Sequence, residues 1–445
     1  MKAYLVTLGC PKNEADSAGM ATLLRQAGYT LVERPAGADV LIVNTCGFIG
    51  PAREESLRVI RELAARKRPG QRLVAAGCMV PLHGEALRAI PGVDALLGVE
   101  RLSAIAEFLA QQGYGPPALS PALPFPGAGL SAVHGASAYL KIADGCDARC
   151  AFCTIPRIKG PYRSAPRDLL VAEARALVAR GVQEIVLVAQ DTTAYGRDLG
   201  EKDGLPGLIE ALLEAVPELP WLRIMYTYPQ HITPRLIEVM ARFPQVCPYL
   251  DIPLQHAHPA TLARMGRPAD IQRVRALLRS MRERIPDLVL RTTFIVGYPG
   301  ETEEEFAALR DFVQEQAFER VGVFVYSKEE GTPAAELPDP VPEEVAFARR
   351  EELMALQQGT ARRWGERQVG RTIPVLIEGI DRKAHLVVGR SRWDAPEVDG
   401  LVLAQGDAQV GTIVPVRITA ASAYDLWGTV EAGGPLRPGR RSNPG

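Results

Sequence analysis

The stretch DGCDARCAFCTIP, residues 144–156, places three of the chain's seven cysteines within eight positions. Three thiols cannot all pair with one another as disulfides. Cys146, Cys150 and Cys153 are spaced C-x3-C-x2-C and follow the apolar run AYLKIAD, which we interpret as a strand. Thiols this close together on a loop are typical of a metal, iron–sulfur or redox site.

The composition of the 445-residue chain, with 47% hydrophobic and 23% charged residues, predicts a soluble globular protein of roughly two to four domains. A formal net charge of −1 excludes a uniformly basic nucleic-acid-binding protein but leaves room for a local basic patch. The apolar run at the start ends at Gly9, and no long apolar segment follows. We therefore expect a cytoplasmic protein without membrane contact, in which clustered cysteines bind metal or do chemistry.

The chain is divided by a stretch without any Asp, Glu, Lys or Arg, residues 108–139. Its Pro, Gly, Ser and Ala content predicts an extended linker rather than a helix or strand. We place an N-terminal domain at 1–112, the linker at 113–136, a second domain at 137–366, a third at 367–432 and a disordered tail at 433–445.

The N-terminal domain alternates short apolar runs with helix-like stretches, which predicts a parallel α/β sheet. The runs AYLVTLGC, DVLIVNTC and RLVAAGC end in Cys10, Cys46 and Cys78. Because the carboxyl ends of parallel strands share one edge, we expect these three thiols to converge there. Three ordinary buried cysteines at strand ends are the alternative, and the pattern alone leaves both open.

Six further strand–helix units follow the linker and predict a partial (β/α) barrel. Its predicted strands end in polar residues, which are Gln190, Asp191, Tyr226, Tyr228, Gln255 and His256. Such residues mark the catalytic face of this fold class. From about residue 369, short β-type runs separated by Gly and Asp turns predict a small antiparallel β-barrel.

The cysteine loop fits an iron–sulfur cluster better than a zinc ion. A 4Fe-4S cluster usually takes four thiolates, so three leave one iron open for a substrate. A zinc site would need a fourth Cys or His close by, and the nearest following candidate, His231, is far downstream. A redox-active thiol pair is a further alternative.

The loop, with Phe152 before its last cysteine, resembles the signature of the radical S-adenosylmethionine (SAM) enzymes. The resemblance implies a catalytic 4Fe-4S cluster on Cys146, Cys150 and Cys153 whose open iron chelates SAM. One electron then cleaves SAM to methionine and a 5′-deoxyadenosyl radical.

The segments LGCPKN, VNTCGF and AAGC, followed by this loop, resemble the methylthiotransferase family over nearly the whole chain. The resemblance implies an N-terminal methylthiotransferase domain, a radical SAM domain and a C-terminal TRAM barrel. It also implies a second 4Fe-4S cluster, on Cys10, Cys46 and Cys78, that holds sulfur for insertion. Cys247 matches no motif and is interpreted as a core thiol.

Two branches of that family compete: one modifies a transfer-RNA adenosine, the other an aspartate of small-subunit ribosomal protein twelve. The stretches TLGCPKNEADS, IPRIKGPYRS, YLDIPLQH and VVGRSRWDAPEVDG resemble the second branch. The transfer-RNA branch has a PVQSG-like segment where this chain has PLQHA, residues 253–257. One departure is Ala165, where a second arginine of an RSR-like run is expected.

The charge of the third domain points the same way. Residues 367–431 hold seven Arg and Lys against eight Asp and Glu, whereas a domain that grips RNA phosphates should be basic. Asp394, Glu397 and Asp399 lie in one loop and would suit a basic protein partner, unless they are ordinary solvated charges.

Further SAM contacts are implied at two places. Gly297, Gly300 and Glu301 in FIVGYPGE resemble the segment beside the adenine and ribose of SAM; a strand-to-helix turn with Glu301 at the helix start is the alternative. Gln190 and Asp191 end the second strand, where the superfamily meets the methionine part of SAM, and a capped strand end is the alternative. His256 is a proton donor, a substrate contact or a satisfied core histidine.

The resemblance implies one reaction. A methyl group from one SAM is placed on sulfur at the N-terminal cluster, and a second SAM is cleaved to the radical. The radical takes hydrogen from the aspartate β-carbon, which receives the methylthio group. The ribosomal protein would dock on the TRAM barrel, an electron donor is required, and we expect a monomer. One alternative is the same chemistry on transfer-RNA adenosine. The other is a non-catalytic iron–sulfur electron carrier or RNA-binding scaffold, and the polar strand ends argue against this second alternative.

Overall fold

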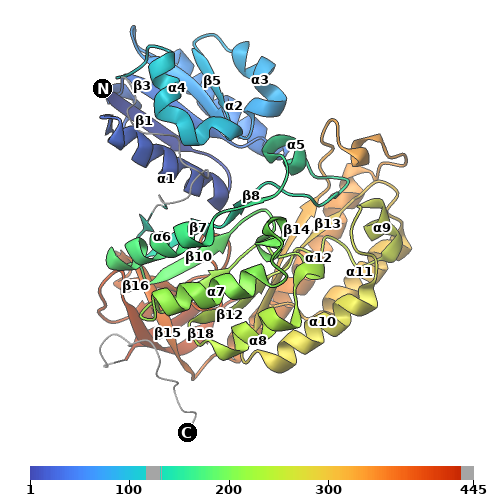
Figure 1. Cartoon of the computed structure of the whole chain (residues 1–445). Helices are drawn as coiled ribbons and strands as arrows, with labels where there is room; N and C mark the ends of the chain where they lie inside the picture. Colours follow the sequence, from blue (N-terminus) through green and yellow to red (C-terminus); the bar gives the residue numbers. More distant parts are fainter. Residues whose placement is uncertain (117–130, 132, 432–445) are drawn as a thin grey trace.

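The computed structural model describes residues 1–116, 131 and 133–431, which form three units (Figure 1). A smaller N-terminal unit lies at the top of Figure 1, above a larger central sheet, and a β-barrel packs behind the lower part of that sheet. The domain boundaries given above stay a prediction. Most of the predicted linker and the tail 433–445 lie outside the described residues.

The N-terminal unit is a five-stranded parallel sheet of order β2-β1-β3-β4-β5. Its strands are β1 Lys2–Thr7, β2 Thr30–Leu31, β3 Val40–Thr45, β4 Arg72–Gly77 and β5 Ala95–Gly98. Helices α1 Pro11–Gln26 and α4 Ile105–Gln111 pack on one face, and α2 Gly50–Ala65 and α3 Val80–Arg88 on the other. Strand β3 is buried on both faces, which explains its continuous apolar sequence. The strand order reverses between β1 and β3, where doubly wound sheets form a ligand-binding crevice at the carboxyl edge.

The central unit is a seven-stranded sheet of order β14-β13-β12-β11-β10-β7-β6. Its strands are β6 Val133–His134, β7 Ser137–Lys141, β10 Glu184–Val188, β11 Trp221–Ile224, β12 Val246–Asp251, β13 Val289–Val296 and β14 Arg320–Val325. All neighbours are parallel except β6 and β7, so six parallel strands build the predicted partial barrel. Strand β6 lies within the predicted linker, so the expectation of no strand there is wrong at its end, where the chain covers the open edge of β7.

Helices cover the outer face of this sheet and share one large apolar core with it (Figure 1). They are α6 Arg167–Ala179, α7 Gly204–Ala215, α8 Pro234–Arg242, α10 Ile271–Arg284, α11 Glu303–Gln316 and α12 Glu343–Glu366. Shorter elements lie in the loops: β8 Ala143–Asp144, α5 Ile155–Lys159, β9 Arg163–Ser164 and α9 Pro259–Arg264. The 3-10 turns are Pro35–Gly37, Val99–Ala104, Thr192–Ala194, Arg197–Leu199, Pro229–His231 and Pro333–Glu336.

The third unit is a closed five-stranded barrel of order β15-β16-β17-β19-β18. Its strands are β15 Thr372–Asp381, β16 Leu386–Ser391, β17 Val402–Gln405, β18 Ile413–Ala421 and β19 Leu426–Val430. The pairs are antiparallel as expected, except β17 and β19, which are parallel where the barrel closes. A second core joins the barrel to the inner face of the central sheet, including Tyr139, Trp221, Tyr249 and the buried thiol of Cys247.

Buried charges also hold the barrel against the central sheet. The fully buried carboxylate of Glu184 in β10 accepts hydrogen bonds from Arg223 Nε at 2.7 Å and from Arg390 Nη2 of the barrel at 2.6 Å. Burial favours the neutral acid, but the two arginines outweigh it and lower the pKa of Glu184 to about 2. Glu184 is therefore an ionised link between two units.

The acidic loop of the barrel serves the same purpose. Asp394 accepts from Arg320 Nη2 at 2.7 Å, and Asp399 accepts from the Tyr249 hydroxyl at 2.7 Å. Both carboxylates are buried, with side chains 3% and 2% exposed. The expectation that this loop offers its charges to a basic partner, or to solvent, is wrong for these two residues. Their partners come from β14 and β12, which are distant in sequence.

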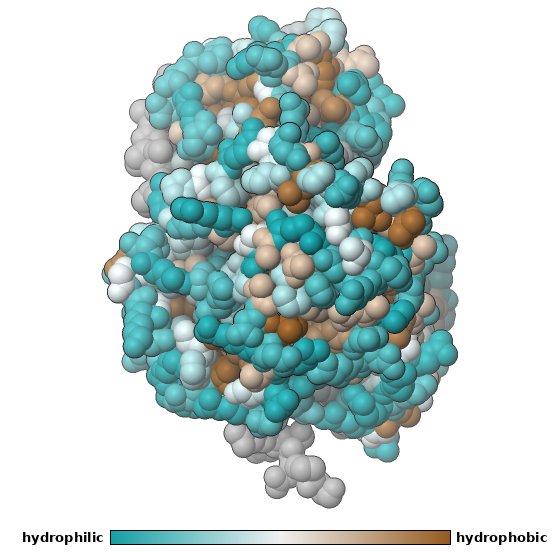
Figure 2. Space-filling view, turned by 90° about the vertical axis from the view of Figure 1, so that its right-hand side faces the viewer, coloured by the Kyte–Doolittle hydropathy of each residue, from teal (hydrophilic) through white to brown (hydrophobic). Residues whose placement is uncertain are grey.

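Most of the face seen in Figure 2 is hydrophilic, with hydrophobic residues in separate patches. Within the described part of the chain, no helix combines the length and apolarity needed to cross a membrane.

Candidate functional site

The cysteine loop lies at the carboxyl edge of the central sheet, directly after β7 and β8. Backbone bonds hold it: Cys146 N–H donates to Gly160 O at 3.2 Å, and Cys153 N–H donates to Cys150 O at 3.1 Å. Gly145, with φ +78°, precedes the first cysteine, and a side chain there would collide with the Pro161 carbonyl. Glycine is thus required for the turn that brings the cysteines onto this edge.

The three thiols of this loop are partly shielded from water. Burial raises the pKa of Cys146 to about 11 and that of Cys153 to about 12. Arg267 Nη1 lies 3.7 Å from Cys150 Sγ and packs over the Tyr228 ring, 4.2 Å from its centroid. Sequence reasoning missed Arg267, because it is 117 positions from Cys150.

The donor set of the cysteine loop suits an iron–sulfur cluster. Across the described residues, no three Cys, His, Asp or Glu side chains converge closely enough to hold one metal ion. Each thiolate of a 4Fe-4S cluster binds a separate iron, so its ligands stand further apart than those of a zinc ion. Three soft sulfur ligands on one loop suit that cluster.

The N-terminal cysteines follow three neighbouring strands at the crevice beside β1 and β3. Cys10 is the N-cap of α1, Cys46 follows β3 and Cys78 follows β4. The loops touch: a Cβ on Gly9 would lie 3.0 Å from Cys46 Sγ. Burial raises the pKa of Cys78 to about 12 and also raises that of Cys46. The structure therefore brings together three thiols separated by 36 and 32 positions in the sequence.

Asn13 connects the three cysteine-bearing loops. Its Nδ2 donates to Leu8 O at 2.8 Å and to Thr45 O at 3.0 Å, and its Oδ1 accepts from Cys78 Sγ at 3.4 Å. The side chain is buried. Asn13 lies within the LGCPKN segment, but its role was not predicted from the sequence. The available signal was its place in the first turn after a strand-end cysteine.

A buried ionic network joins the N-terminal unit to the cysteine loop of the central unit. Asp16 of α1 contacts Lys141 Nζ at 2.6 Å and Lys159 Nζ at 2.8 Å, and Asp144 contacts Lys141 at 2.8 Å. Burial opposes charge on Lys159, but Asp144 and Asp16 outweigh it and hold the pKa of the ammonium well above its usual value. Lys159 also lies near Cys78, whose charged form it favours. The two cysteine sets therefore border one seam between the units.

Of the two predicted SAM contacts that follow β10, Gln190 has an unpaired side-chain atom, whereas Asp191 is paired within the protein. The Oε1 atom of Gln190 is buried and has no hydrogen-bond partner among the described residues, so it is available to a ligand. The carboxylate of Asp191 is engaged: Oδ1 accepts from Thr193 Oγ1 at 2.6 Å, and Oδ2 lies 2.7 Å from His231 Nδ1. Asp191 therefore caps the strand end, and contact of Gln190 and Asp191 with SAM stays a prediction. Phe152 packs against the small apolar cluster of Ala151, Met265, Tyr298 and Ala334.

Gly297 and Glu301 have structural partners. Glu301 Oε1 lies 3.1 Å from His256 Nε2, and Oε2 accepts from the Gly297 N–H and from Arg349 Nη1. Gly297 has φ +71°, and a side chain there would collide with Ala346 of α12. His256 Nδ1 accepts from His258 N at 3.0 Å, so its proton is on Nε2 and faces Glu301. His256 is the satisfied core histidine of the alternatives above.

Gly300 and Ala165 add two observations. Gly300 has φ +73° and lies beside Arg264, whose Nη2 donates to its carbonyl at 3.0 Å. Contact of Gly297, Gly300 and Glu301 with SAM stays a prediction. Ala165 is fully buried in the main core, and its carbonyl accepts from the Tyr195 hydroxyl at 2.9 Å.

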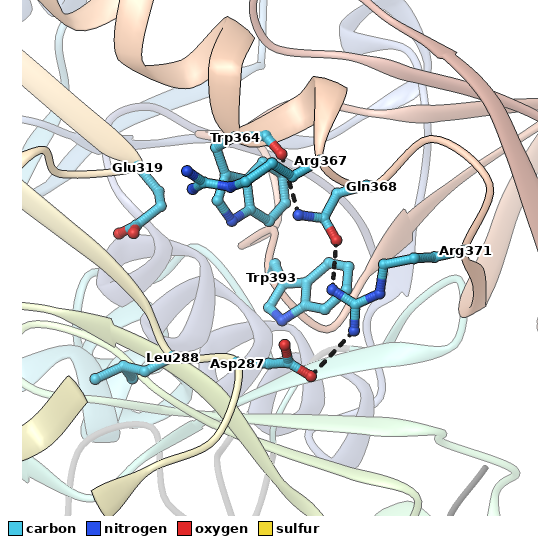
Figure 3. A pocket seen from close by; sticks show the side chains of 8 residues that line it. All are labelled: Asp287, Leu288, Glu319, Trp364, Arg367, Gln368, Arg371 and Trp393. Atoms are coloured by element: carbon cyan, nitrogen blue, oxygen red, sulfur yellow. Dashed lines mark hydrogen bonds and ion pairs between the residues drawn. The ribbon is translucent and has the colours of Figure 1, made fainter. Parts of the chain in front are cut away.

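Two cavities lie away from the cysteines. One, of about 260 Å³, is lined by Asp287, Leu288, Glu319, Trp364, Arg367, Gln368, Arg371 and Trp393 (Figure 3). Leu288 and Glu319 directly precede β13 and β14, so this cavity opens at the amino edge of the sheet, opposite the cysteine loop. Most of its polar groups are paired, as the bonds of Arg371 to Gln368 and Asp287 in Figure 3 show. The other, of about 600 Å³, belongs to the barrel alone.

The three units match three known families. Residues 2–98 match the Uncharacterized protein family UPF0004, residues 140–313 the Radical SAM superfamily and residues 369–430 the TRAM domain. The structure of the radical SAM methyltransferase TsrM from Kitasatospora setae, with cobalamin and a 4Fe-4S cluster bound, is similar with a TM-score of 0.57 at 16% identity, over 75% of this chain and 73% of that one. The radical SAM enzyme OxsB gives 0.52 at 12% identity, over 80% of this chain and 56% of that one.

The fold and the cysteine loop thus define a radical SAM enzyme. Proteins of similar sequence show to which family within this class the chain belongs. "Ribosomal protein uS12 methylthiotransferase RimO" of Roseiflexus sp. (strain RS-1) is 52% identical over 96% of this chain and 97% of the relative. The protein of the same name from Anaeromyxobacter sp. (strain K) is 46% identical over 99% of this chain and 95% of the relative. The chain belongs to the RimO family of methylthiotransferases.

Proposed function

We propose that this chain adds a methylthio group to the β-carbon of an aspartate in ribosomal protein uS12, with SAM as methyl donor and radical source. Family membership at 52% identity over nearly the full chain supports the substrate. The observation that carries the chemistry is the position of two three-cysteine sets, from two different units, along one seam.

Each set would hold one 4Fe-4S cluster. Cys146, Cys150 and Cys153 would hold the cluster that binds SAM, and the second cluster, where sulfur is delivered, would be held by Cys10, Cys46 and Cys78. Bound SAM with its cluster supplies a radical able to take hydrogen from a carbon that no base could deprotonate.

The chain's own groups prepare this edge. The free Oε1 of Gln190 would accept a hydrogen bond from the amino group of SAM. Arg267 contacts Cys150 and packs over the Tyr228 ring, and Phe152 packs on a small apolar cluster beside the loop. The network of Asp16, Lys141 and Lys159 keeps the N-terminal unit in register with the cysteine loop.

Substrate docking requires a different surface from the acidic loop of the barrel, because Asp394 and Asp399 are already paired inside the protein. We further propose that the chain works in the cytoplasm as a monomer with an external electron donor.

The test is anaerobic turnover of the cluster-reconstituted chain with SAM, sulfide and a reductant. Ribosomal protein uS12 and an isopentenyl-adenosine transfer RNA are supplied together, and mass spectrometry identifies which of them gains a methylthio group in place of hydrogen. We expect gain on uS12, lost in Cys153→Ala and retained in Cys247→Ala, which alters a buried thiol of the core.

Gain on the transfer RNA would keep the chemistry and overturn the substrate. Gain on neither, with no 5′-deoxyadenosine formed, would favour the electron carrier. The unpaired Gln190 oxygen argues against a carrier, which has no need of a ligand-facing polar atom.

A further inference from the structure

Lys12 is a half-buried cation that forms no ion pair with the carboxylates of the described residues. It is the second residue of α1, and its Nζ lies 3.4 Å from the centroid of the Tyr226 ring. Throughout the described residues, no Asp or Glu lies within ion-pair distance of this ammonium. A half-buried ammonium that takes part in no ion pair keeps its N–H groups available to an anionic ligand.

The other lysines at this seam show the contrast. Lys141 and Lys159 have side chains 0% and 2% exposed, and each pairs with both Asp16 and Asp144. Their charges are used to hold the units together. The charge of Lys12 is not used in this way, although Lys12 lies on the same helix as Asp16.

Lys12 lies where the carboxyl edges of the two parallel sheets meet. It stands two residues after Cys10, and Tyr226 stands two residues after the end of β11, so the contact joins the carboxyl edges of both sheets. Burial raises the pKa of the Cys46 thiol, and the nearby Lys12 ammonium opposes that rise. The ammonium therefore lies between the N-terminal cysteines and the face of the central sheet.

The pair is held rigidly in place. Tyr226 has φ +60°, a left-handed conformation that non-glycine residues seldom adopt and that gathers at functional sites. Its N–H donates to Asp251 Oδ2 at 3.2 Å, and its carbonyl accepts from Thr192 N at 2.9 Å. On the other side, Asp16 fixes α1. Lys12 thus has a prearranged aromatic support and free N–H donors.

We propose that Lys12 binds the side-chain carboxylate of the aspartate that is modified, an inference that rests on the proposed function. That carboxylate is bonded directly to the reacting β-carbon, so holding it also places the carbon. A carboxylate brought between two sets of thiolates needs a cation beside it. The ammonium keeps one face on the Tyr226 ring and donates its remaining N–H groups to the carboxylate.

The same contact provides specificity. A half-buried lysine binds a carboxylate more tightly than it binds a neutral amide or a nucleobase. Lys12 would thus distinguish an aspartate from an asparagine at the same position of the substrate, and a protein carboxylate from an adenosine.

The experiment compares dissociation constants of the cluster-reconstituted full chain for two ligands: uS12, and uS12 whose modified aspartate is replaced by asparagine. The enzyme variants are Lys12→Met, which keeps the side-chain length, and Lys12→Arg, which keeps the charge. Lys202→Met is the matched control, because Lys202 is an exposed lysine with no role in the site. Iron content and visible absorption are recorded for every variant to show that both clusters are present.

We expect the wild type and Lys202→Met to bind the aspartate form about 10- to 100-fold more tightly than the asparagine form. Lys12→Met should bind both forms equally, at the affinity of the asparagine form, and Lys12→Arg should keep part of the preference. An unchanged preference in Lys12→Met, or an equal loss for both ligands, would overturn the proposal. If wild type does not methylthiolate uS12 at all, the proposed function fails instead, which the turnover assay detects separately.

Discussion

The ammonium of Lys159 lies 2.8 Å from Oδ2 of Asp16, and this contact ties the helix that begins after Cys10 to the helix that follows the Cys146–Cys153 loop. Both side chains are buried, at 2% and 1% exposure. Because a buried ion pair resists separation, the contact holds the two cysteine sets at a constant relative position.

Replacing Asp16 with Asn should destabilise the chain by about 3–5 kcal/mol, because Lys141 and Lys159 would both lose a buried counter-charge. Urea unfolding measures the change. The control is Glu62→Gln, which removes the exposed Arg58–Glu62 pair and should cost no more than about 0.5 kcal/mol. Equal effects of the two substitutions would show that the network adds no stability.

Gly9→Ala should remove the N-terminal cluster and spare the other one. A Cβ at Gly9 would stand 2.7 Å from Cys46 Cβ, which must shift. Gly28→Ala is the matched control, since Gly28 also has positive φ, +84° against +99°, but nothing lies within 4 Å. We expect iron per chain after anaerobic reconstitution to fall by about half in Gly9→Ala, as the loss of one of two equal clusters requires.

The same iron assay counts the clusters directly. The triple variants Cys10→Ala/Cys46→Ala/Cys78→Ala and Cys146→Ala/Cys150→Ala/Cys153→Ala should each keep about half of the iron. Cys247→Ala should keep all of it, because Cys247 is fully buried in the apolar core. Complete loss of iron in either triple variant alone would contradict two independent clusters.

Glu184 should make docking of the barrel pH-dependent. Its pKa is lowered from 4.5 to about 2, so its stabilising contribution is complete above about pH 4.5 and is lost as the pH falls toward 2. The shift corresponds to about 3 kcal/mol. Unfolding free energies of the wild type and Glu184→Gln, measured across this range, should converge as the pH falls. Parallel curves would show that Glu184 carries no such linkage.

Gln190→Ala should weaken SAM binding without loss of stability, because its buried Oε1 has no partner in the protein. Gln245→Ala is the control, since Gln245 also has a buried, unpaired Oε1 but stands at the amino end of β12. Calorimetric titration with SAM measures the affinity and thermal unfolding measures the stability. Equal affinities of the two variants would remove Gln190 from the SAM site.

The three-unit architecture was predictable from the sequence because it depends on local pattern. Apolar runs of strand length alternating with helical stretches predicted both parallel sheets, and short β runs with turns predicted the barrel. The cysteine motif is equally local: Cys146, Cys150 and Cys153 occupy one loop, so their spacing is visible in the chain itself.

Side-chain partners were not predictable in this way. Asp394 and Asp399 were expected at the surface but pair inside the protein with Arg320 and Tyr249. The partners of Glu301, which are His256 and Arg349, were not expected either, and its predicted contact with SAM stays a prediction. A charged residue gives no local sign of whether its counter-ion lies across an interface.

The sequence by itself therefore determined the main pattern of strands and helices, the family resemblance and the identity of the six motif cysteines, because these depend on neighbours in the chain. Only the tertiary structure decided that Asp16 meets Lys141 across 125 positions, and that Lys12 lies over Tyr226 without a carboxylate partner. Packing of separate units sets these contacts, since burial makes an ion pair strong and leaves an unpaired cation available to a ligand.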